Sequence, residues 1–352
     1  MKASVVLRLL AVAFIVSNSA FAAWEVTYLH PSGSTGSVSH GVSAGQQVGF
    51  SNSHAGLWAG TAGSWVDLNP AGSTESRAYD VLNGQQAGWA EFNGATHAGF
   101  WSGTAGSWVD LNPLGSTDSR AYEIEGGKQV GYSYLGANHA GMWSGTAASW
   151  VDLNPSGSVE SEARSISGGQ QVGLANFGGE DHAGIWSGTA GSWVDLHPAG
   201  ARRSMASGIA GGQQVGNVSP GLYPHASLWT GTAASWADLN PAGSTVSSAW
   251  GVAAGRQVGY ARPGSYDHAS LWTGTPDSWV DLHSYLTADY GPSSAYAIEV
   301  VGDDIWVVGR ANNYTTGIQE AILWHNVIPE PSSVLILGSG VLALAGFVRR
   351  KR

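Results

Sequence analysis

The sequence has no cysteine among its 352 residues, which excludes disulfides, thiolate nucleophiles and thiolate metal sites. Charged residues make up only 11% of the chain, and the formal net charge is -10. Such a chain lacks the basic surface that follows a phosphate backbone, so we expect no nucleic-acid partner. Its stability must come from packing, and the 17 tryptophans are the main candidates for that role.

Motifs of known enzymes are scarce too. The sequence holds no Gly-Lys-Ser/Thr phosphate loop and no His-Glu-x-x-His zinc motif, and we expect no Gly-x-Ser-x-Gly nucleophile elbow either. We therefore predict that the protein is not an enzyme and that it uses no cofactor. Glycine, in contrast, is abundant, with 51 residues, and it falls at regular positions along the chain. Regular glycines mark turns between ordered segments, so we expect a globular protein.

A stretch of 17 residues at 54–70, HAGLWAGTAGSWVDLNP, returns throughout the chain. Further copies begin at His97, His139, His182, His225 and His268, and residues 320–324 form a degenerate seventh copy. Each period contains four short strand-like runs divided by glycine turns; in the second full period they are 77–82, 86–91, 97–101 and 108–111. Four antiparallel strands in every 40 to 45 residues are typical of a β-propeller blade.

Two of the strand types occur in unequal numbers. A Gln-Val-Gly-type strand occurs seven times, at Val48, Ala87, Val130, Val172, Val215, Val258 and Val308. The Trp-Val-Asp-Leu strand occurs six times, and the last period stops after Trp324 without one. Residues 24–31, WEVTYLHP, have the missing pattern at the start of the chain. We predict an all-β fold, a seven-bladed propeller over residues 24–326, whose last blade is closed by the N-terminal strand.

The lone N-terminal strand is expected to be the outermost of its blade, so the Ala-Tyr-Asp-Val run should be innermost. This order places the two copied hairpin turns on one face of the disc and the remaining loops on the other. The repeat also resembles the HAF-type repeats of exported bacterial proteins, although here Gly or Ser follows His-Ala. That resemblance supports a propeller and implies no activity.

The N-terminal residues 1–22 have the pattern of a signal peptide. Lys2 and Arg8 provide a basic start, an apolar run follows, and Ala20-Phe21-Ala22 has the small-x-small pattern of a signal peptidase site. We therefore expect export, with signal peptidase as a processing partner.

The C-terminal residues 327–352 contain Pro329-Glu330-Pro331, an apolar run at 334–348 and a basic tail at 349–352 that includes Arg349 and Arg350. This order closely resembles the PEP-CTERM sorting signal. The resemblance implies that exosortase, a membrane-embedded protease of Gram-negative bacteria that make exopolysaccharide, recognises these residues. Independently, 15 apolar residues in a helix reach only about 22 Å, which is short of the roughly 30 Å hydrocarbon layer. The run is therefore a poor permanent anchor. We expect a transmembrane helix that holds the protein in the inner membrane only until processing, with an ordinary tail anchor as the alternative.

Six histidines share one repeat position: His54, His97, His139, His182, His225 and His268. A metal ion needs three or four ligands within about 2.1 Å of one centre, whereas equivalent positions on different blades lie far apart. We expect each imidazole to bond a neighbouring strand or the aspartate of the outer strand, and we predict no metal site. Glu160 and Glu162 could serve glycoside hydrolysis as a carboxylate pair, but pairing between blades with Arg164 or Arg202 explains them without catalysis.

The loops between the second and third strands differ from copy to copy, and nearly every one presents an aromatic residue beside small polar ones. Loops on a rigid scaffold often carry function, and aromatic faces suit sugar binding. We predict ligand-binding residues there, with drift in unconstrained loops as the alternative: Phe92, Tyr134, Phe177, Tyr223, Tyr266 and Tyr314.

These observations favour an exported propeller at the cell surface or in the extracellular matrix that binds exopolysaccharide or a surface protein without catalysis. One alternative is a polysaccharide-acting hydrolase or lyase with a site in the central cavity. Another is a purely structural component of a biofilm.

Overall fold

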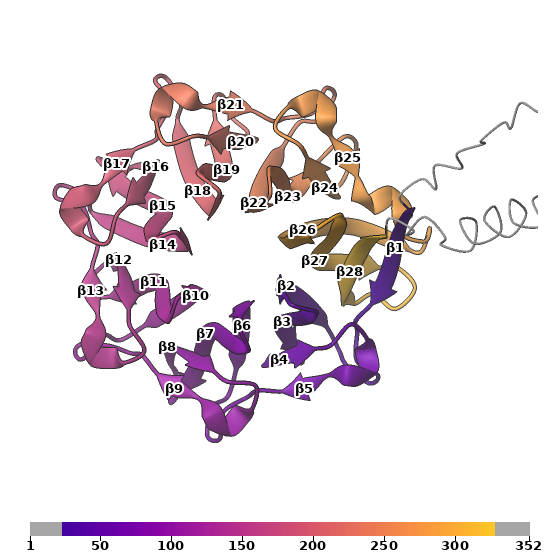
Figure 1. The fold of residues 1–352 in the computed structure, drawn as a ribbon, viewed down its shortest axis with the longest axis horizontal. Helices are drawn as coiled ribbons and strands as arrows, with labels where there is room; N and C mark the ends of the chain where they lie inside the picture. The colour runs from indigo at the N-terminus through magenta and orange to yellow at the C-terminus, as the bar shows by residue number, and fades with distance from the viewer. Residues whose placement is uncertain (1–22, 328–352) are drawn as a thin grey trace, which may run out of the picture. The chain divides into compact units, whose positions relative to one another are not determined.

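The computed structural model describes residues 23–327, which form seven four-stranded antiparallel sheets set as blades around a central opening (Figure 1). The predicted all-β seven-bladed propeller is therefore confirmed. Residues 24–326 form one compact unit. The predicted signal peptide at 1–22 and apolar segment at 334–348 lie outside the described residues. Within residues 23–327, no helix has the length and hydropathy needed to cross a bilayer.

The innermost strands of the first six blades are β2 (Ser37–Ser43), β6 (Ser76–Leu82), β10 (Ser119–Glu125), β14 (Glu160–Ser167), β18 (Arg203–Ala210) and β22 (Ser247–Ala253). The second strands are β3 (Gln46–Ser51), β7 (Gln85–Phe92), β11 (Lys128–Tyr134), β15 (Gln170–Phe177), β19 (Gln213–Ser219) and β23 (Arg256–Ala261). The third strands are β4 (His54–Trp58), β8 (Ala95–Trp101), β12 (Asn138–Trp143), β16 (Glu180–Trp186), β20 (His225–Trp229) and β24 (His268–Trp272).

The outermost strands of these blades are β5 (Val66–Asp67), β9 (Val109–Asp110), β13 (Val151–Asp152), β17 (Val194–Asp195), β21 (Ala237–Asp238) and β25 (Val280–Asp281). A short 3-10 turn precedes each of these six strands: η1 (Ala62–Ser64), η2 (Ala105–Ser107), η3 (Ala147–Ser149), η4 (Ala190–Ser192), η5 (Ala233–Ser235) and η6 (Pro276–Ser278). A seventh turn, η7 (Leu282–Tyr285), follows β25. The seventh blade, from inside to outside, is β26 (Tyr290–Val301), β27 (Asp304–Asn313), β28 (Gln319–Val327) and β1 (Ala23–Tyr28).

Strand β1 closes the ring, as the unequal repeat counts predict. It lies beside β28 as the outermost strand of the seventh blade, so the two ends of the propeller meet in one sheet. Just after β1, Leu29 is fully buried, and its backbone N donates to the oxygen of Ala321 at 2.9 Å. The ring of Tyr28 stacks on Tyr290 with centroids 5.1 Å apart. The chain therefore forms a sealed disc of strands.

The outermost strand is shorter than predicted. In the second blade only Val109–Asp110 forms a strand, because Trp108 ends the 3-10 turn η2 and turns its ring inward. That ring lies over Gly99, where an added Cβ would meet it at 2.1 Å. The fifth blade has a serine at this position, and Ser227 accepts a hydrogen bond from Nε1 of Trp236 at 2.9 Å. The glycine or serine after His-Ala is thus a packing partner of the second tryptophan.

The hydrophobic core consists of clusters between neighbouring blades. Each blade contributes one fully buried tryptophan: Trp58, Trp101, Trp143, Trp186, Trp229, Trp272 and Trp324. Trp101 of the second blade, for example, packs with Val48, Leu57 and Leu68 of the first. The copied tryptophans therefore stabilise the contacts between blades as well as the blades themselves.

A serine hydrogen bond repeats at every junction between blades. Ser76, at the start of β6, accepts from the backbone N of Ala55 in the preceding blade at 2.9 Å and donates to Asn69 Oδ1 at 2.5 Å. At the closing junction, Ser37 accepts from the backbone N of Ala321 at 3.0 Å. The asparagine of Leu-Asn-Pro therefore orients the serine that joins two blades.

The seven innermost strands begin on one face of the disc and end on the other. They end at hairpin turns such as Asn83-Gly84, whose positive φ angles of 52° and 76° suit tight turns. We call the side with these turns the turn face. The strands begin at the opposite side, the loop face, where the loops between second and third strands also lie.

Candidate functional site at the central channel

Each innermost strand contains a register shift that leaves one residue unpaired against the second strand. A bulge of this kind re-aims a side chain, and such bulges are frequent next to functional sites. All seven unpaired residues line the cavities at the centre of the disc. We call them the bulge ring: His40, Tyr79, Tyr122, Arg164, Ser207, Trp250 and Tyr296.

Six members of the bulge ring contact one another in sequence around the channel. The ring-centroid distances are Trp250–Tyr296 4.9 Å, Tyr296–His40 4.9 Å, His40–Tyr79 5.1 Å and Tyr79–Tyr122 5.4 Å, and the Arg164 guanidinium lies 4.6 Å from the centre of the Tyr122 ring. Ser207 stands between Arg164 and Trp250 in blade order. A band of aromatic faces thus lines most of the channel, with a small polar residue at one side.

The residue after each bulge determines the type of contact between neighbouring innermost strands. Asp80 Oδ2 accepts from the backbone N of Ile124 at 3.0 Å, and Glu123 Oε2 accepts from that of Ile166 at 2.8 Å. At the junction between the first and second blades the equivalent residue is Gly41, where an added Cβ would lie 2.8 Å from a backbone oxygen of the next blade. Some junctions are therefore bridged by an acidic side chain, while others bring the backbones together.

Burial perturbs the ionisable groups of the channel. It raises the pKa of the Asp80 carboxyl to about 6. Burial, followed by the nearby Asp80, raises the pKa of Glu123 well above its usual range. The pKa of His40 is lowered to about 3, mainly by burial and further by Arg77 and Arg310, so this imidazole is neutral at physiological pH. Perturbed groups in a cavity are typical of functional sites, although structural networks produce them as well.

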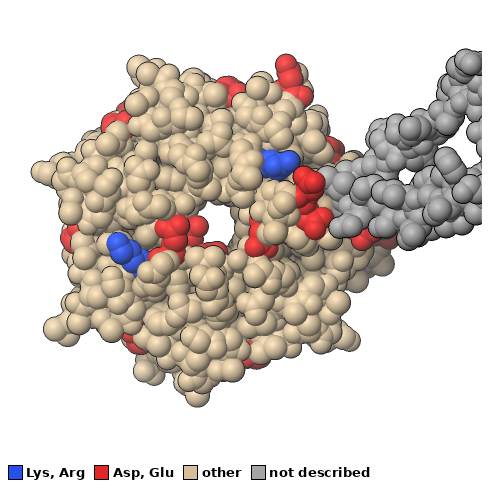
Figure 2. Space-filling view, in the orientation of Figure 1, with Lys and Arg blue, Asp and Glu red and all other residues tan. Residues whose placement is uncertain are grey.

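The channel has chemically different mouths. Toward the turn face, a cavity of about 410 Å³ is lined by Glu125 and Glu299 in addition to Asp80 and Glu123. Toward the loop face, a cavity of about 530 Å³ is lined by Arg120 and by Arg164, Tyr132 and Glu162, among others. Figure 2 shows the opening at the centre of the disc with acidic side chains beside it. The turn-face mouth is therefore acidic, while arginines and tyrosines surround the loop-face mouth.

The repeated histidines behave as predicted, because each pairs with the aspartate of the outer strand in its own blade. The Nδ1–Oδ2 distances are 2.7 to 2.9 Å in all six copies. These pairs are partly exposed and lie in separate blades. Their role is to connect the third and outermost strands.

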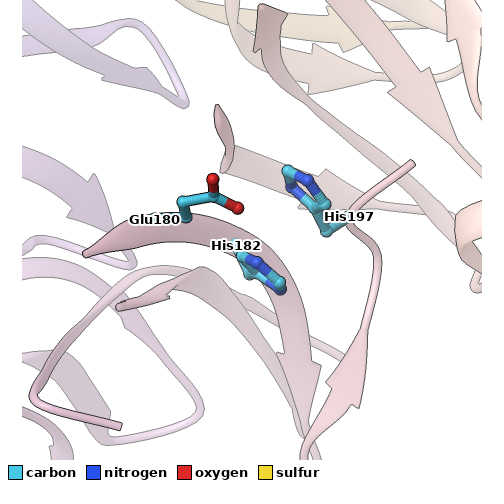
Figure 3. Close-up of side chains that lie close together, drawn as sticks. All are labelled: Glu180, His182 and His197. Atoms are coloured by element: carbon cyan, nitrogen blue, oxygen red, sulfur yellow. The ribbon is translucent and has the colours of Figure 1, made fainter. Parts of the chain in front are cut away.

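One cluster in the fourth blade brings together groups that are capable of binding metal. Ligand atoms of Glu180, His182 and His197 lie within 4.8 Å of one another (Figure 3). The two imidazoles stack with centroids 4.0 Å apart and planes 11° apart. The lone pairs of stacked rings lie in parallel planes and do not converge on one ion. His197 is also engaged, with Nε2 donating to the oxygen of Ala201 at 3.1 Å and Nδ1 2.8 Å from Ser204 Oγ.

His197 takes the place of the junction asparagine of other blades. In the second blade, Asn112 donates to the oxygen of Ser116 at 3.3 Å and accepts from Ser119 at 2.6 Å. His197 makes the same two connections with its two ring nitrogens. We therefore interpret this cluster as a junction between blades and assign no metal to it.

The predicted loop aromatics all lie on the loop face, but the structure does not join them into one platform. Phe92 packs on His97 and Trp108, and Phe177 makes the equivalent contacts in the fourth blade. Tyr266 packs on His268 and His283. Among the described residues, none of the six rings stacks on another of the six. The remaining three are exposed: Tyr134, Tyr223 and Tyr314.

Two other sequence features have structural explanations. Glu162 pairs with Arg164 at 2.5 Å, as suggested, but within strand β14 instead of between blades. Residues 41–45, Gly-Val-Ser-Ala-Gly, do fit the Gly-x-Ser-x-Gly spacing of a nucleophile elbow, so the expectation that this spacing is absent was wrong. They form the hairpin between β2 and β3, whereas a nucleophile elbow joins a strand to a helix.

The bulge ring itself was missed. Its signal is present in the sequence as one column that changes in nearly every copy, within strands whose flanking alanines are copied. In a regular strand, side chains alternate between the two faces of the sheet. The alternation of residue types therefore does not reveal the bulge that turns this repeat position toward the channel axis.

Comparisons with known proteins agree with this division into body and tail. Residues 327–352 match the model of the PEP-CTERM protein-sorting motif, so the tail is a recognition sequence for exosortase sorting, typical of exported, transiently membrane-anchored proteins of Gram-negative bacteria. No curated protein matches the sequence. The likeness of the repeats to HAF-type repeats stays a prediction.

Among solved structures, a puromycin hydrolase S511A mutant is similar with a TM-score of 0.56 and 12% identity over 82% of this chain and 53% of that one. The chain thus spans about half the length of that protein. TolB from Acinetobacter baumannii matches with a TM-score of 0.41 and 9% identity, over 83% of this chain and 80% of that one. Trypanosoma rangeli sialidase matches with a TM-score of 0.29 and 10% identity, over 81% and 58%. At these identities the hydrolase likeness indicates the fold alone.

Proposed function

We propose that this protein is an exported, exosortase-sorted propeller that binds a carbohydrate polymer without catalysis at the loop-face mouth of its central channel. The observation that carries the proposal is the bulge ring. Its seven positions hold five residue types, while the buried tryptophan and alanine positions of the same blades are copied almost unchanged. Divergence of a cavity wall beside a copied core is expected when that wall contacts a ligand instead of maintaining the fold.

The chemistry of the channel suits sugars. Trp250, Tyr296, Tyr79 and Tyr122 offer flat apolar faces, and the hydroxyl and imidazole groups between them offer hydrogen bonds. Concave sites that combine aromatic faces with a few polar groups are typical of small-molecule binding. Export to the cell surface or matrix of a bacterium that makes exopolysaccharide provides the polymer. The loop aromatics, Tyr223 and Tyr266 among them, remain a second candidate surface on the same face.

A binding experiment with two matched double variants tests this proposal. The propeller, residues 24–326, is titrated with exopolysaccharide from its host, with and without Trp250→Ala plus Tyr296→Ala. Loss of two stacked rings should weaken binding by more than about 1 kcal/mol per ring. The double variant Tyr223→Ala plus Tyr266→Ala should leave binding unchanged. The opposite pattern would place the ligand on the loops, and no saturable binding by the wild type would favour the structural alternative.

A hydrolase or lyase remains the second candidate, and the observation that favours it is the pair of buried carboxyls with raised pKa values, Asp80 and Glu123. Each, however, already accepts a backbone N–H of the next blade, which is a structural role. Release of reducing ends or unsaturated sugars during the titration, abolished by Glu123→Gln, would identify an enzyme.

A processing experiment tests the proposal that the protein is sorted by exosortase. Because the tail matches the sorting motif, we expect the mature surface-associated protein to lack it. Mass spectrometry of protein from the native host should find no peptide from residues 334–352. Its recovery intact from surface protein would make the tail a plain anchor.

A further inference from the structure

The loop-face mouth gathers polar atoms that have no hydrogen-bond partner. Among the buried side-chain atoms of residues 23–327 without a hydrogen-bond partner, five belong to residues that line this one cavity. Glu162 Oε2 lies in the ion pair with Arg164, and the other four atoms are His40 Nε2, Arg120 Nε, Arg164 Nε and Ser207 Oγ. Buried polar groups are nearly always hydrogen-bonded, so an accumulation of exceptions needs an explanation. The tryptophan Nε1 atoms in the same state lie in the packed blade core, whereas these four border open space.

Arginines dominate the charge at this mouth. Arg120 and Arg164 line the cavity, and Arg77 and Arg310 lie close enough to lower the pKa of His40. Within the described chain, Arg77 and Arg164 pair with carboxylates, at 2.8 and 2.5 Å, whereas Arg120 forms no ion pair. Removing both terminal signals leaves only 9 basic residues in the body, so four of them gather here in an otherwise acidic protein.

Aromatic rings hold these guanidinium groups in place. Arg164 lies 4.6 Å from the Tyr122 ring centre, and Arg120 lies 5.1 Å from that of Trp89. A guanidinium stacked by its face leaves its N–H edge available, and that edge matches a carboxylate in geometry. The arginines are thus arranged to receive a planar anion beside the aromatic faces of the bulge ring.

The mouth continues into a second cavity. Met205 lines both the mouth and a groove of about 700 Å³ between the fourth and fifth blades. Both signs of charge line the groove, with Arg202 and Arg203 opposite Glu180 and Asp181, so it favours neither sign. A polymer with one residue at the mouth therefore has a neighbouring groove for its next residues.

From these observations we infer that the polymer is an acidic saccharide, such as a polyuronate, whose carboxylate binds Arg120 and Arg164 while its sugar ring lies against the bulge ring. This inference rests on the proposed function. The neutral His40 and Ser207 supply hydrogen bonds to ring hydroxyls. The adjoining groove takes the next residues of the chain.

The test compares three probes on the propeller, residues 24–326. They are an oligogalacturonate, the same oligomer with its carboxylates reduced to alcohols, and poly-glutamate of similar length. The inference predicts at least about tenfold tighter binding of the oligogalacturonate than of either other probe, and weaker binding at higher salt. Arg120→Gln should weaken oligogalacturonate binding about 10- to 100-fold, because it removes a charge-assisted hydrogen bond.

Lys128→Gln is the matched control, because it removes the same charge from the same blade at the exposed turn face. Its affinity should equal that of the wild type, and equal thermal melting of both variants would establish that folding is intact. Equal binding of the reduced oligomer would overturn the acidic-saccharide inference and leave the proposed function standing. Equal binding of poly-glutamate would reduce the mouth to a simple anion site. Failure of both sugar probes and of the host polymer would overturn both proposals.

Discussion

The outer part of each blade and the bulge ring belong to the same repeat, yet they have diverged very differently. The outer part keeps a buried tryptophan, a His–Asp pair and a 3-10 turn in almost every copy. The bulge ring changes from histidine to tyrosine, arginine, serine and tryptophan around the axis. The outer part is constrained by contacts that every blade must make with the next. The ring contacts open space, so folding leaves its chemistry free to serve a ligand.

The largest effect is expected when a part of the framework that all blades share is removed. Deletion of residues 24–31 takes away β1 and the buried Leu29 and exposes the edge of β28. Burial of a leucine alone contributes about 2–5 kcal/mol, so the whole strand should cost more than that and promote self-association. Thermal unfolding and light scattering measure both effects. An unchanged melting temperature in a monomeric protein would contradict the closure.

One substitution in the blade core and one in the bulge ring should differ in their effect on stability. Trp186 is fully buried between blades, so Trp186→Ala should lower the free energy of unfolding by about 3–5 kcal/mol. Trp250 is partly exposed in the channel, and Trp250→Ala should cost clearly less while it weakens ligand binding. Denaturant titration of both variants measures the difference. Equal losses of stability would mean that the bulge ring is part of the framework.

The pH dependence of stability tests the buried acids of the channel. The pKa of Asp80 rises from 3.8 to about 6 on folding, so the folded state favours the protonated form. This contribution is fully present below pH 3.8 and is lost as the pH rises through about 6. The difference corresponds to roughly 3 kcal/mol, and Asp80→Asn should remove this part of the pH dependence, while the raised pKa of Glu123 continues to contribute its own part. Chemical denaturation between pH 4 and 7 measures it, with the exposed Asp277→Asn as control.

The smallest effect is expected at the rim of the disc, by which we mean the His–Asp pairs that join the third and outermost strands. His97 and Asp110 form a partly exposed pair at 2.7 Å, and such surface pairs contribute about 0.2–1 kcal/mol. A double-mutant cycle with His97→Ala and Asp110→Ala should give a coupling energy in that range. A coupling above about 2 kcal/mol would show that the rim holds the blade together more strongly than its exposure implies.

The repeat counts predicted the fold almost completely. The seven Gln-Val-Gly strands predicted the number of blades. The missing seventh Trp-Val-Asp-Leu strand predicted the role of residues 24–31, because a closed ring leaves no unpaired edge. The shortened outer strand could not be predicted, because it depends on how far Trp108 turns onto Gly99. The aspartate of the outer strand was one of the two partners predicted for the repeated histidines, because both residues recur at one position in six copies.

Less of the candidate site than of the fold could be predicted from the sequence. Reasoning about loops led to Phe92 and Phe177, yet these rings pack on their own blades. The channel residues lie in strands, where alternation alone assigns Tyr79 and Arg164 no special direction. Only the bulge turns them to the axis, and a bulge is a shift in register between two strands that no single strand reveals.

The closing strand has a mechanical consequence. The described chain leaves the disc from β28, which is hydrogen-bonded on one side to β27 and on the other to β1. A pull applied through this end of the described chain is therefore resisted by two hydrogen-bonded neighbours at once, of which β27 runs antiparallel to β28. Such a force acts first on the seventh blade, the one sheet that contains both ends of the propeller.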